Sequence, residues 1–364
     1  MNHNIYSDRK IFGFPEKIAS FRSGEITAPI YVRIKPINRC SHACSWCVYS
    51  DGHTRPKDRP EEHLQAGMHG AMKEQDVMDT DKLLYLLEDL KAIGTQAVTF
   101  SGGGEPLMHP AIVQAFDFCR HLSLKFSIIT NGQSLTGDRA KQLAFADWVR
   151  VSMDYATPGQ MARSRNVPER AFGQVIANLQ EFARIKQPTC DLGVNFIVTR
   201  ENHRDLFLAA GGLKECGVEN VRFSPVYCKG FLEYHAPLQD EVIRQLNYIQ
   251  DSLVDAKFSV NTTYDLSSPS KRDHHPFTRC FYAQTVPVVG ADLGIYACHN
   301  TAYTAHGFLG HIIDAPFREV WFSDVVAKRL RELNPCKVCN HECANHSKVA
   351  LFEELATARF DPFV

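Results

Sequence analysis

Three cysteines close together near the amino end of the chain are the residues best suited to chemistry. Cys40, Cys44 and Cys47 form a C-x3-C-x2-C run in the stretch 39–49, RCSHACSWCVY, directly after an apolar segment at 30–37. Three thiolates at this spacing can bind one face of a cubane iron–sulfur cluster and leave its fourth corner open. A structural zinc site is the alternative, although such sites usually pair one C-x2-C with a second pair. The run predicts an incompletely ligated metal centre.

A glycine-rich loop, SGGGEP at 101–106, is the second feature, and it follows a predicted strand at 97–100. Gly103 and Gly104 let backbone groups approach a ligand closely, and the carboxylate of Glu105 can accept hydrogen bonds from an ammonium group. Glycine-rich loops are common, so the loop gains its meaning from its place one βαβ unit after the cysteine run.

Together the cysteine run and the GGEP loop resemble the radical S-adenosylmethionine (SAM) superfamily. In that family the open iron chelates the amino and carboxylate groups of SAM, and reduction of the cluster cleaves SAM to methionine and a 5′-deoxyadenosyl radical. The resemblance implies that Trp46 lies beside the adenine. It also implies that Gly103, Gly104 and Glu105 hold the methionine amino group.

The same resemblance implies further SAM contacts at the ends of the third and fourth strands. The matching positions are Thr130 and Asn131 in a T-N-G sequence, Ser152 and Asp154 in an S-x-D sequence, and Arg165. Arg163 and Arg170 are alternatives to Arg165 as the carboxylate-binding arginine. The T-N-G sequence is equally typical of a simple Asx turn.

Five cysteines near the carboxyl end form a second constellation: Cys280, Cys298, Cys336, Cys339 and Cys343. Two distant cysteines and a C-x2-C pair can hold the four corners of another cubane. The pattern resembles the Twitch domain, a shortened SPASM domain, and implies one auxiliary [4Fe–4S] cluster on Cys280, Cys298, Cys336 and Cys339. Cys343 is then an alternative ligand or a spectator. A zinc ribbon on the same four cysteines is the other interpretation.

Four of the twelve cysteines remain. Cys119, Cys190 and Cys216 lie on apolar faces and are predicted to be small buried side chains. Cys228 follows the sixth predicted strand and should face the active site. It is a candidate hydrogen-atom donor, as in radical SAM epimerases, with inert packing as the alternative.

The elements that must position these residues alternate regularly. Predicted strands lie at 30–37, 97–100, 125–130, 148–153, 192–199 and 220–226, and predicted helices at 81–94, 109–122, 136–145, 169–186, 202–215 and 238–255. This alternation predicts βαβ units and a parallel sheet. The fold class is therefore α/β, a partial (β/α)6 TIM-like barrel. In such barrels active-site residues sit on the loops after the strands.

The regular alternation of predicted strands and helices ends after residue 257. A hairpin is predicted from 286–289 and 295–298 around GADLG, with helices at 315–333 and 346–358. We therefore expect an amino-terminal extension at 1–29, a radical SAM core at 30–256, a Twitch/SPASM-type domain at 257–350 and a tail at 351–364. A charged loop at 51–80 is either a solvated surface loop or a cover over substrate.

Composition narrows the class of protein. The chain has 364 residues, 44% of them hydrophobic and 22% charged, with a formal net charge of −1. This balance gives no electrostatic reason to expect a nucleic acid or an anionic membrane as partner. No signal peptide or long apolar run is evident, so the protein is predicted to be cytoplasmic with reduced cysteines.

These observations predict a radical SAM oxidoreductase. The expected reaction is hydrogen-atom abstraction from a small, carbohydrate-like substrate, followed by oxidation with the auxiliary cluster as electron acceptor. A flavodoxin or ferredoxin is the expected electron donor. The alternatives are an epimerase that uses Cys228, a maturase that acts on a peptide, and a non-enzymatic zinc scaffold.

Overall fold

One open sheet runs through the molecule. The computed structural model describes residues 7–49, 72–228, 230–266, 277–339, 343 and 345–358. In this part of the chain the sheet has ten strands in the order β10-β9-β8-β1-β2-β3-β4-β5-β6-β7. The strands are β1 (Tyr31–Ile34), β2 (Ala97–Phe100), β3 (Lys125–Thr130), β4 (Trp148–Ser152), β5 (Asp191–Val198), β6 (Asn220–Pro225), β7 (Ser259–Thr262), β8 (Val288–Val289), β9 (Gly294–Tyr296) and β10 (Phe308–His311).

Neighbouring strands from β1 to β7 are parallel, and β8 is parallel to β1. β8, β9 and β10 form an antiparallel meander. Alternation along a strand places successive side chains on opposite faces. On β1, Val32 and Ile34 are fully buried in the main core, whereas Arg33 between them is only half-buried. Because the strands are parallel, their carboxyl ends meet along one edge of the sheet.

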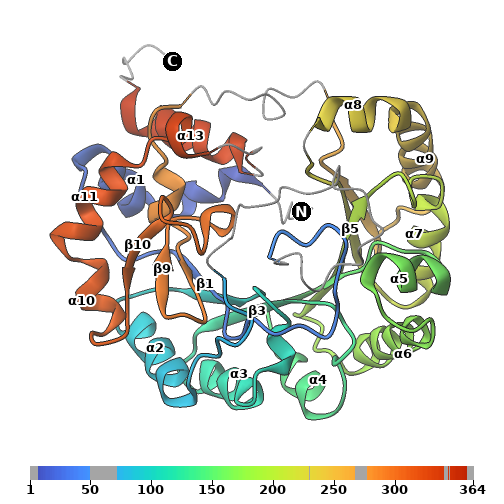
Figure 1. The fold of residues 1–364 in the computed structure, drawn as a ribbon, viewed down its shortest axis with the longest axis horizontal. Coiled ribbons are helices and arrows are strands. Elements are labelled where there is room, and N and C mark those ends of the chain that lie inside the picture. The colour runs from blue at the N-terminus through green and yellow to red at the C-terminus, as the bar shows by residue number, and fades with distance from the viewer. Residues whose placement is uncertain are drawn as a thin grey trace.

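Helices surround the strands on the outside (Figure 1). The ones that connect successive parallel strands are α2 (Thr80–Ala92), α3 (Ile112–His121), α4 (Gly137–Leu143), α5 (Pro158–Arg165), α6 (Arg170–Ile185), α7 (Leu206–Glu215), α8 (Phe231–His235) and α9 (Gln239–Ser252). Apolar side chains at helical spacing form their inner faces, as in α2, where Leu83, Leu87 and Leu90 are fully buried. The helices thereby fix the positions of the loops at both edges of the sheet.

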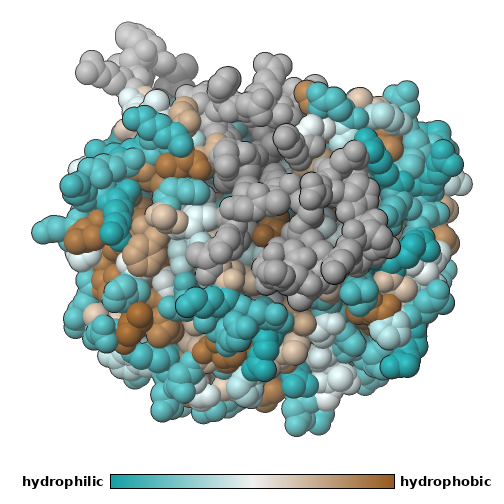
Figure 2. All heavy atoms as spheres, viewed as in Figure 1, coloured by the Kyte–Doolittle hydropathy of each residue, from teal (hydrophilic) through white to brown (hydrophobic). Residues whose placement is uncertain are grey.

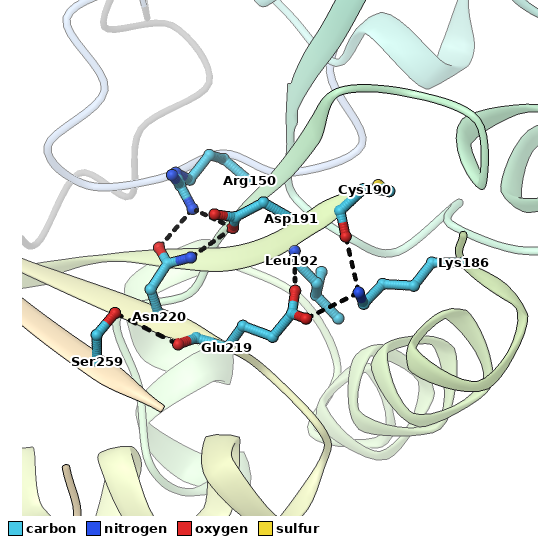
Figure 3. A network of polar contacts seen from close by, with 8 residues as sticks. All are labelled: Arg150, Lys186, Cys190, Asp191, Leu192, Glu219, Asn220 and Ser259. Atoms are coloured by element: carbon cyan, nitrogen blue, oxygen red, sulfur yellow. Dashed lines mark hydrogen bonds and ion pairs between the residues drawn. The ribbon is translucent and has the colours of Figure 1, made fainter. Parts of the chain in front are cut away.

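A buried polar network joins β4, β5 and β6 at their amino-terminal ends (Figure 3). Arg150 donates to both Asp191 and Asn220, and Asn220 also donates to Asp191. Gly193 makes this crossing possible, since a Cβ there would lie 1.7 Å from an Arg150 guanidinium nitrogen. The network connects the amino-terminal ends of these three strands, opposite to the carboxyl ends that carry the predicted ligand-binding loops.

Elements from both ends of the chain pack side by side (Figure 1). α1 (Pro15–Ser23) meets α13 (His346–Thr357), where the rings of Phe21 and Phe352 stack with centroids 5.5 Å apart. The remaining helices are α10 (Phe317–Trp321), α11 (Asp324–Glu332) and α12 (Pro335–Val338), with 3-10 turns η1 (Asp8–Gly13), η3 (Pro106–Met108), η4 (Ala236–Leu238), η6 (Phe281–Gln284) and η7 (His299–Thr301).

On the face that Figure 2 shows, the coloured surface is mainly hydrophilic, with separate hydrophobic areas. Large exposed apolar side chains lie on different helices, for example Tyr85 on α2, Leu208 on α7 and Val325 on α11. None of the helices in the described ranges is both long enough and apolar enough to traverse a bilayer.

The predicted α/β fold is confirmed, with each of the six predicted strands present within one or two residues except β1, which is shorter. The helix predicted at 315–333 is two helices, because Ser323 caps a new helix by accepting a hydrogen bond from the Val326 backbone. The pattern gave no signal for α1, α5, α8, β7 or β10. The boundary at 256–257 stays a prediction, and the sheet continues across it through β7 and β8. Most of the predicted loop at 51–80 lies outside the described residues.

Candidate active site at the carboxyl ends of the strands

The loop with Cys40, Cys44 and Cys47 follows β1 and lies against the end of α5. The backbone N–H of Ala43 donates to the Arg165 carbonyl at 3.0 Å. A turn within the loop brings the Cys47 N–H to the Cys44 carbonyl at 3.1 Å. All three cysteines line one cavity of about 170 Å³. The structure therefore brings the predicted triplet together at the active-site edge of the sheet.

Hydrogen-bond donors point at two of these sulfurs. An Arg165 guanidinium nitrogen lies 3.2 Å from Cys44 Sγ, and the His42 backbone N–H lies 3.4 Å from Cys40 Sγ. Cys40 is an exposed residue, but loss of solvent around its thiol, with neighbouring negative charge, raises the pKa of that thiol to about 12. Burial also raises the pKa of Cys44 to about 11, although Arg165 opposes that shift. Metal binding deprotonates such thiols, and N–H donors stabilise the resulting thiolates, so this donor set fits an iron–sulfur cluster.

The glycine loop packs directly against the backbone that enters the cysteine loop. Glu105 N–H donates to the Arg39 carbonyl at 2.9 Å. A Cβ at Gly104 would lie 2.0 Å from that same carbonyl oxygen, and a Cβ at Gly103 would lie 2.2 Å from Asn38 Oδ1. Only glycine fits this close approach. The two motifs that the sequence placed one βαβ unit apart thus share one site.

Glu105 is almost fully buried and ties the ends of β2 and β3 together. Its carboxylate accepts hydrogen bonds from Leu107 N–H at 3.0 Å, Thr130 Oγ1 at 2.6 Å and Asn131 N–H at 2.7 Å. Burial raises the pKa of Glu105, and these three donors oppose the rise. The structure gives Glu105 this positioning role, whereas its contact with a SAM amino group stays a prediction.

Asn131 makes the Asx turn and also reaches the cysteine loop. Its Oδ1 accepts a hydrogen bond from Gln133 N–H at 3.0 Å, and its Nδ2 donates to Ser41 Oγ at 3.0 Å. The same Nδ2 lies 4.0 Å from Cys40 Sγ. The turn interpretation and the site interpretation are therefore compatible, because the turn directs the amide towards the cysteines.

Arg165, the last residue of α5, connects the end of β4 to the cysteine loop. Its guanidinium forms a buried ion pair with Asp154 and donates to the Ser152 carbonyl at 2.9 Å. Arg163 and Arg170, the alternatives from sequence, are both exposed. Asp154 Oδ2 is buried and has no hydrogen-bond partner among the described residues. This oxygen is an acceptor for a polar ligand, which fits the SAM contact predicted for Asp154.

Trp46, predicted to lie beside the adenine, is half-buried between the second and third cysteines. The Arg165 guanidinium lies 5.3 Å from the centre of the Trp46 ring and 5.7 Å from that of Tyr155. The two rings help to hold the guanidinium in place. The adenine contact itself stays a prediction.

The carboxyl-terminal cysteines converge from separate segments. Cys280 directly precedes η6, Cys298 directly precedes η7, and Cys336 and Cys339 lie in and just after α12. Burial raises the pKa of Cys280, and Cys298, Cys343 and Cys339 raise it further. Burial and then Cys298, Cys343 and Cys336 likewise raise the pKa of Cys339, to about 12. Cys280, Cys298, Cys339 and Cys343 thus lie within electrostatic reach of one another, and Cys336 lies within reach of Cys339.

This arrangement bears on the choice between Cys336 and Cys343 as the fourth ligand. Cys336 is exposed, and its thiol lies 3.4 Å from the Phe277 carbonyl oxygen. Cys343 is half-buried and coupled electrostatically to Cys298. Its lower exposure and its electrostatic influence on Cys280 and Cys339 favour Cys343 over the Cys336 expected from sequence, and either assignment remains a prediction. In the described ranges no three His, Cys, Asp or Glu side chains are gathered around a single metal-ion position.

Cys228, the candidate hydrogen-atom donor, lies three residues beyond the end of β6 and is 6% exposed. It belongs to the main hydrophobic core cluster. Burial of this kind is shared by Cys119, Cys190 and Cys216, which are buried as expected. A catalytic role for Cys228 stays a prediction.

Sequence reasoning missed a buried polar cluster beside the cavity. It contains Lys35, Asn38, Tyr49, His299 and Tyr303. The one available signal was Lys35, a charged residue that continues the apolar run of β1. Nothing local in the sequence indicates that Tyr49 and His299 meet.

Comparison with known proteins decides the family. Residues 34–209 match the family model of the radical SAM superfamily. The chain contains a radical SAM superfamily domain at 34–209. The match runs from the last residue of β1 to the first part of α7 and thus covers the cysteine run, the glycine loop and the Asp154–Arg165 pair.

Several curated proteins resemble most of the chain. The tungsten-containing aldehyde ferredoxin oxidoreductase cofactor-modifying protein of Pyrococcus furiosus is 22% identical, over 81% of this chain and 81% of its own length. Mycofactocin maturase MftC of Mycobacterium tuberculosis is 23% identical, over 90% and 79%. The PqqA peptide cyclase of Ruegeria pomeroyi is 21% identical, over 86% and 80%.

Among solved structures, Streptococcus suis SuiB bound to S-adenosylmethionine matches with a TM-score of 0.63 and 16% identity, over 96% of this chain and 81% of SuiB. This likeness confirms the fold. The predicted cofactors, a SAM-binding [4Fe–4S] cluster, SAM and an auxiliary cluster, are those of this family and its SPASM-type members. When bound, they supply one-electron reduction and hydrogen-atom abstraction.

The comparisons do not support the carbohydrate-like substrate expected from sequence. The relatives are named for the modification of a cofactor, for maturation and for the cyclisation of a peptide. They favour the peptide maturase alternative over the main prediction. That prediction depended on the small carboxyl-terminal domain and its resemblance to the Twitch domain, which do not report the size or chemistry of the substrate.

Proposed function

We propose that this radical SAM enzyme modifies a peptide. The observation that carries the proposal is the similarity to the PqqA peptide cyclase over 86% of this chain, together with the similarity to a maturase over 90%. The fold admits such a substrate, since the SuiB structure of the same fold has also been solved with its precursor peptide. A radical enzyme that oxidises or crosslinks a peptide side chain is the resulting hypothesis.

Residues of the amino-terminal site would hold the catalytic cofactors. Cys40, Cys44 and Cys47 would bind three irons and leave the fourth to SAM. Arg165 donates to Cys44 and so stabilises a thiolate there, while its ion pair with Asp154 fixes the direction of the guanidinium. Asp154 Oδ2 would accept a hydrogen bond from SAM.

Residues of the carboxyl-terminal site would hold the auxiliary cluster. Cys280, Cys298, Cys339 and Cys343 are the proposed ligands, with Cys336 as the alternative. A cluster with four protein thiolates has no open corner for substrate, so its role would be to accept an electron from the substrate radical. A flavodoxin or ferredoxin would supply electrons to the first cluster.

Anaerobic reconstitution tests the proposal. Roughly eight irons per chain are expected for two cubane clusters. Reduced protein should release 5′-deoxyadenosine from SAM, and short peptides encoded beside its gene should be modified with a mass change visible by mass spectrometry. Peptides with deuterium at the attacked carbon should transfer it into the deoxyadenosine. Deuterium transfer from aminocyclitols or nucleotide sugars, with none from any peptide, would contradict the peptide assignment.

A further inference from the structure

A buried lysine lies between the two cysteine sites. Lys35 directly follows β1, is 0% exposed and donates a hydrogen bond to the Tyr49 hydroxyl. Its Nζ lies 3.9 Å from the centre of the Tyr49 ring and 5.3 Å from that of Tyr303. Aromatic faces attract a cation at these distances. The lysine is therefore held by rings and one hydroxyl, far from bulk water.

Tyr49 connects the two cysteine loops through its hydroxyl. It lies two residues after Cys47, and its hydroxyl donates to the His299 carbonyl at 3.2 Å and lies 3.3 Å from His299 Nδ1. His299 directly follows Cys298. Cys47 also packs against the hydrophobic cluster that contains Tyr49 and Tyr303. A short path of covalent and hydrogen bonds thus runs from a ligand of the first site to a ligand of the second.

Lys35 lies within electrostatic range of one thiol from each cysteine site. Burial lowers the pKa of Lys35 strongly and the Arg33 charge lowers it further, whereas Cys298 and Cys47 are the first two groups that raise it. The two thiols that favour its charged form therefore belong to different sites. Ligation to a cluster deprotonates both thiols, which strengthens this attraction.

We infer that Lys35, held by Tyr49, is a positioning residue shared by both clusters and sets their reduction potentials together. This inference rests on the proposed auxiliary cluster. The potential of an iron–sulfur cluster depends on net charge, hydrogen bonds and burial around it. A buried cation near two anionic centres stabilises the reduced, more negative form of each. Removal of the charge lowers both potentials.

The test is a redox titration followed by electron paramagnetic resonance on reconstituted full-length protein, which reads each cluster apart from turnover. Lys35→Met removes the charge and keeps the side-chain length, and we expect the midpoint potentials of both clusters to fall. Lys35→Arg keeps a cation and should return both towards the wild-type values. Lys186→Met is the matched control, since Lys186 is also buried but pairs with Glu219 at the opposite strand ends (Figure 3).

Tyr49→Phe gives a second, milder test, because it keeps the ring and removes only the hydroxyl that holds Lys35. Tyr49→Phe should lower both midpoint potentials, as Lys35→Met does, but by a smaller amount. If Lys35→Met does not fold, the Tyr49→Phe result decides whether Lys35 has the shared role. Unchanged potentials, or a shift of one cluster alone, overturn the shared role. Wild-type protein with a single cluster signal would instead refute the proposed auxiliary cluster, so the two failures are distinguishable.

Discussion

The two cysteine sites are built in different ways. In the amino-terminal site, Cys40, Cys44 and Cys47 lie within eight residues on one loop, and neighbouring strand ends supply donors and glycines around them. In the carboxyl-terminal site, the cysteines come from segments that are remote in sequence, and the backbone donors to their sulfurs lie in the same segments, as with Asn300 N–H and Cys298 Sγ at 3.5 Å. The fold therefore prepares the amino-terminal site, which we call the prepared site. The carboxyl-terminal site, which we call the assembled site, depends on segments that must be brought together.

This difference predicts how each site responds to change. A site surrounded by built-in donors should keep its fold when its own ligands are removed, although it then loses its function. A site assembled from separate segments gains stability from the cluster itself, because ligand binding to the folded state stabilises that state. Four predictions test the contrast, from the largest expected effect to the smallest.

The double variant Cys40→Ala, Cys44→Ala removes two of three ligands from the prepared site. We expect release of 5′-deoxyadenosine to fall to background, with iron reduced from roughly eight to roughly four per chain. The fold should persist, since the strands and helices around the loop do not depend on these thiols. Iron analysis and circular dichroism measure both results. Retention of SAM cleavage would show that the triplet is not the SAM site.

Cys343→Ser and Cys336→Ser separate the two candidate ligands of the assembled site. We expect Cys343→Ser to lose the auxiliary cluster, because Cys343 is coupled to Cys280, Cys298 and Cys339. Cys336→Ser should keep it, and both variants should still cleave SAM. Iron content and electron paramagnetic resonance distinguish them. The reverse pattern would restore the ligand set expected from sequence.

The prepared site was largely predictable from sequence and the assembled site was not. Alternating patterns locate β1 to β6, and residues placed just after parallel strands must meet at one edge. That reasoning predicts the approach of the cysteine and glycine loops. It cannot choose among Arg163, Arg165 and Arg170, because α5 has no clear apolar period to show which of Arg163 and Arg165 points inward, and Arg170 begins the next helix, α6.

Long-range contacts account for the features of the two sites that could not be predicted from the sequence. Tyr49 meets His299 across 250 positions, and only the docking of η7 beside the cysteine loop brings them together. The choice of Cys343 over Cys336 depends in the same way on which of them comes to lie near Cys280, Cys298 and Cys339. The spacing in the sequence shows how many cysteines are available as ligands, but it does not show which of several loop cysteines lies near the others.

Arg165→Ala tests the support of the prepared site. It leaves Asp154 buried without its partner, and removal of one member of a buried ion pair costs roughly 3–5 kcal/mol of unfolding free energy. Arg163→Ala on the same helix is exposed and should change stability by less than about 0.5 kcal/mol. Urea unfolding under anaerobic conditions measures both. Equal stability of the two variants would mean that the ion pair does not hold the site.

Lys17→Met tests whether Lys17 helps to hold the segment that follows Cys280 in the assembled site. The test uses the pH dependence of the unfolding free energy. Lys17 on α1 is buried and donates to Thr27 Oγ1 at 2.7 Å and to the carbonyl of Gln284, at the end of the turn that follows Cys280. Burial lowers the pKa of Lys17 to about 7 from its usual 10.5. Between these values the unfolded chain binds more protons than the folded protein, so this lysine makes unfolding free energy rise as pH rises, by up to about 1.4 kcal/mol per unit.

The Lys17→Met variant lacks this rise of unfolding free energy with pH. The stability of the wild type relative to Lys17→Met should therefore increase from pH 7 to pH 9, with no further loss below the folded pKa. Urea unfolding followed by tryptophan fluorescence measures it, since Trp321 donates to the Thr27 carbonyl beside the lysine. Parallel pH curves for the two proteins would mean that Lys17 does not carry this burial cost, and that the segment after Cys280 is held by the apolar contacts of Phe21, Phe281 and Phe352 instead.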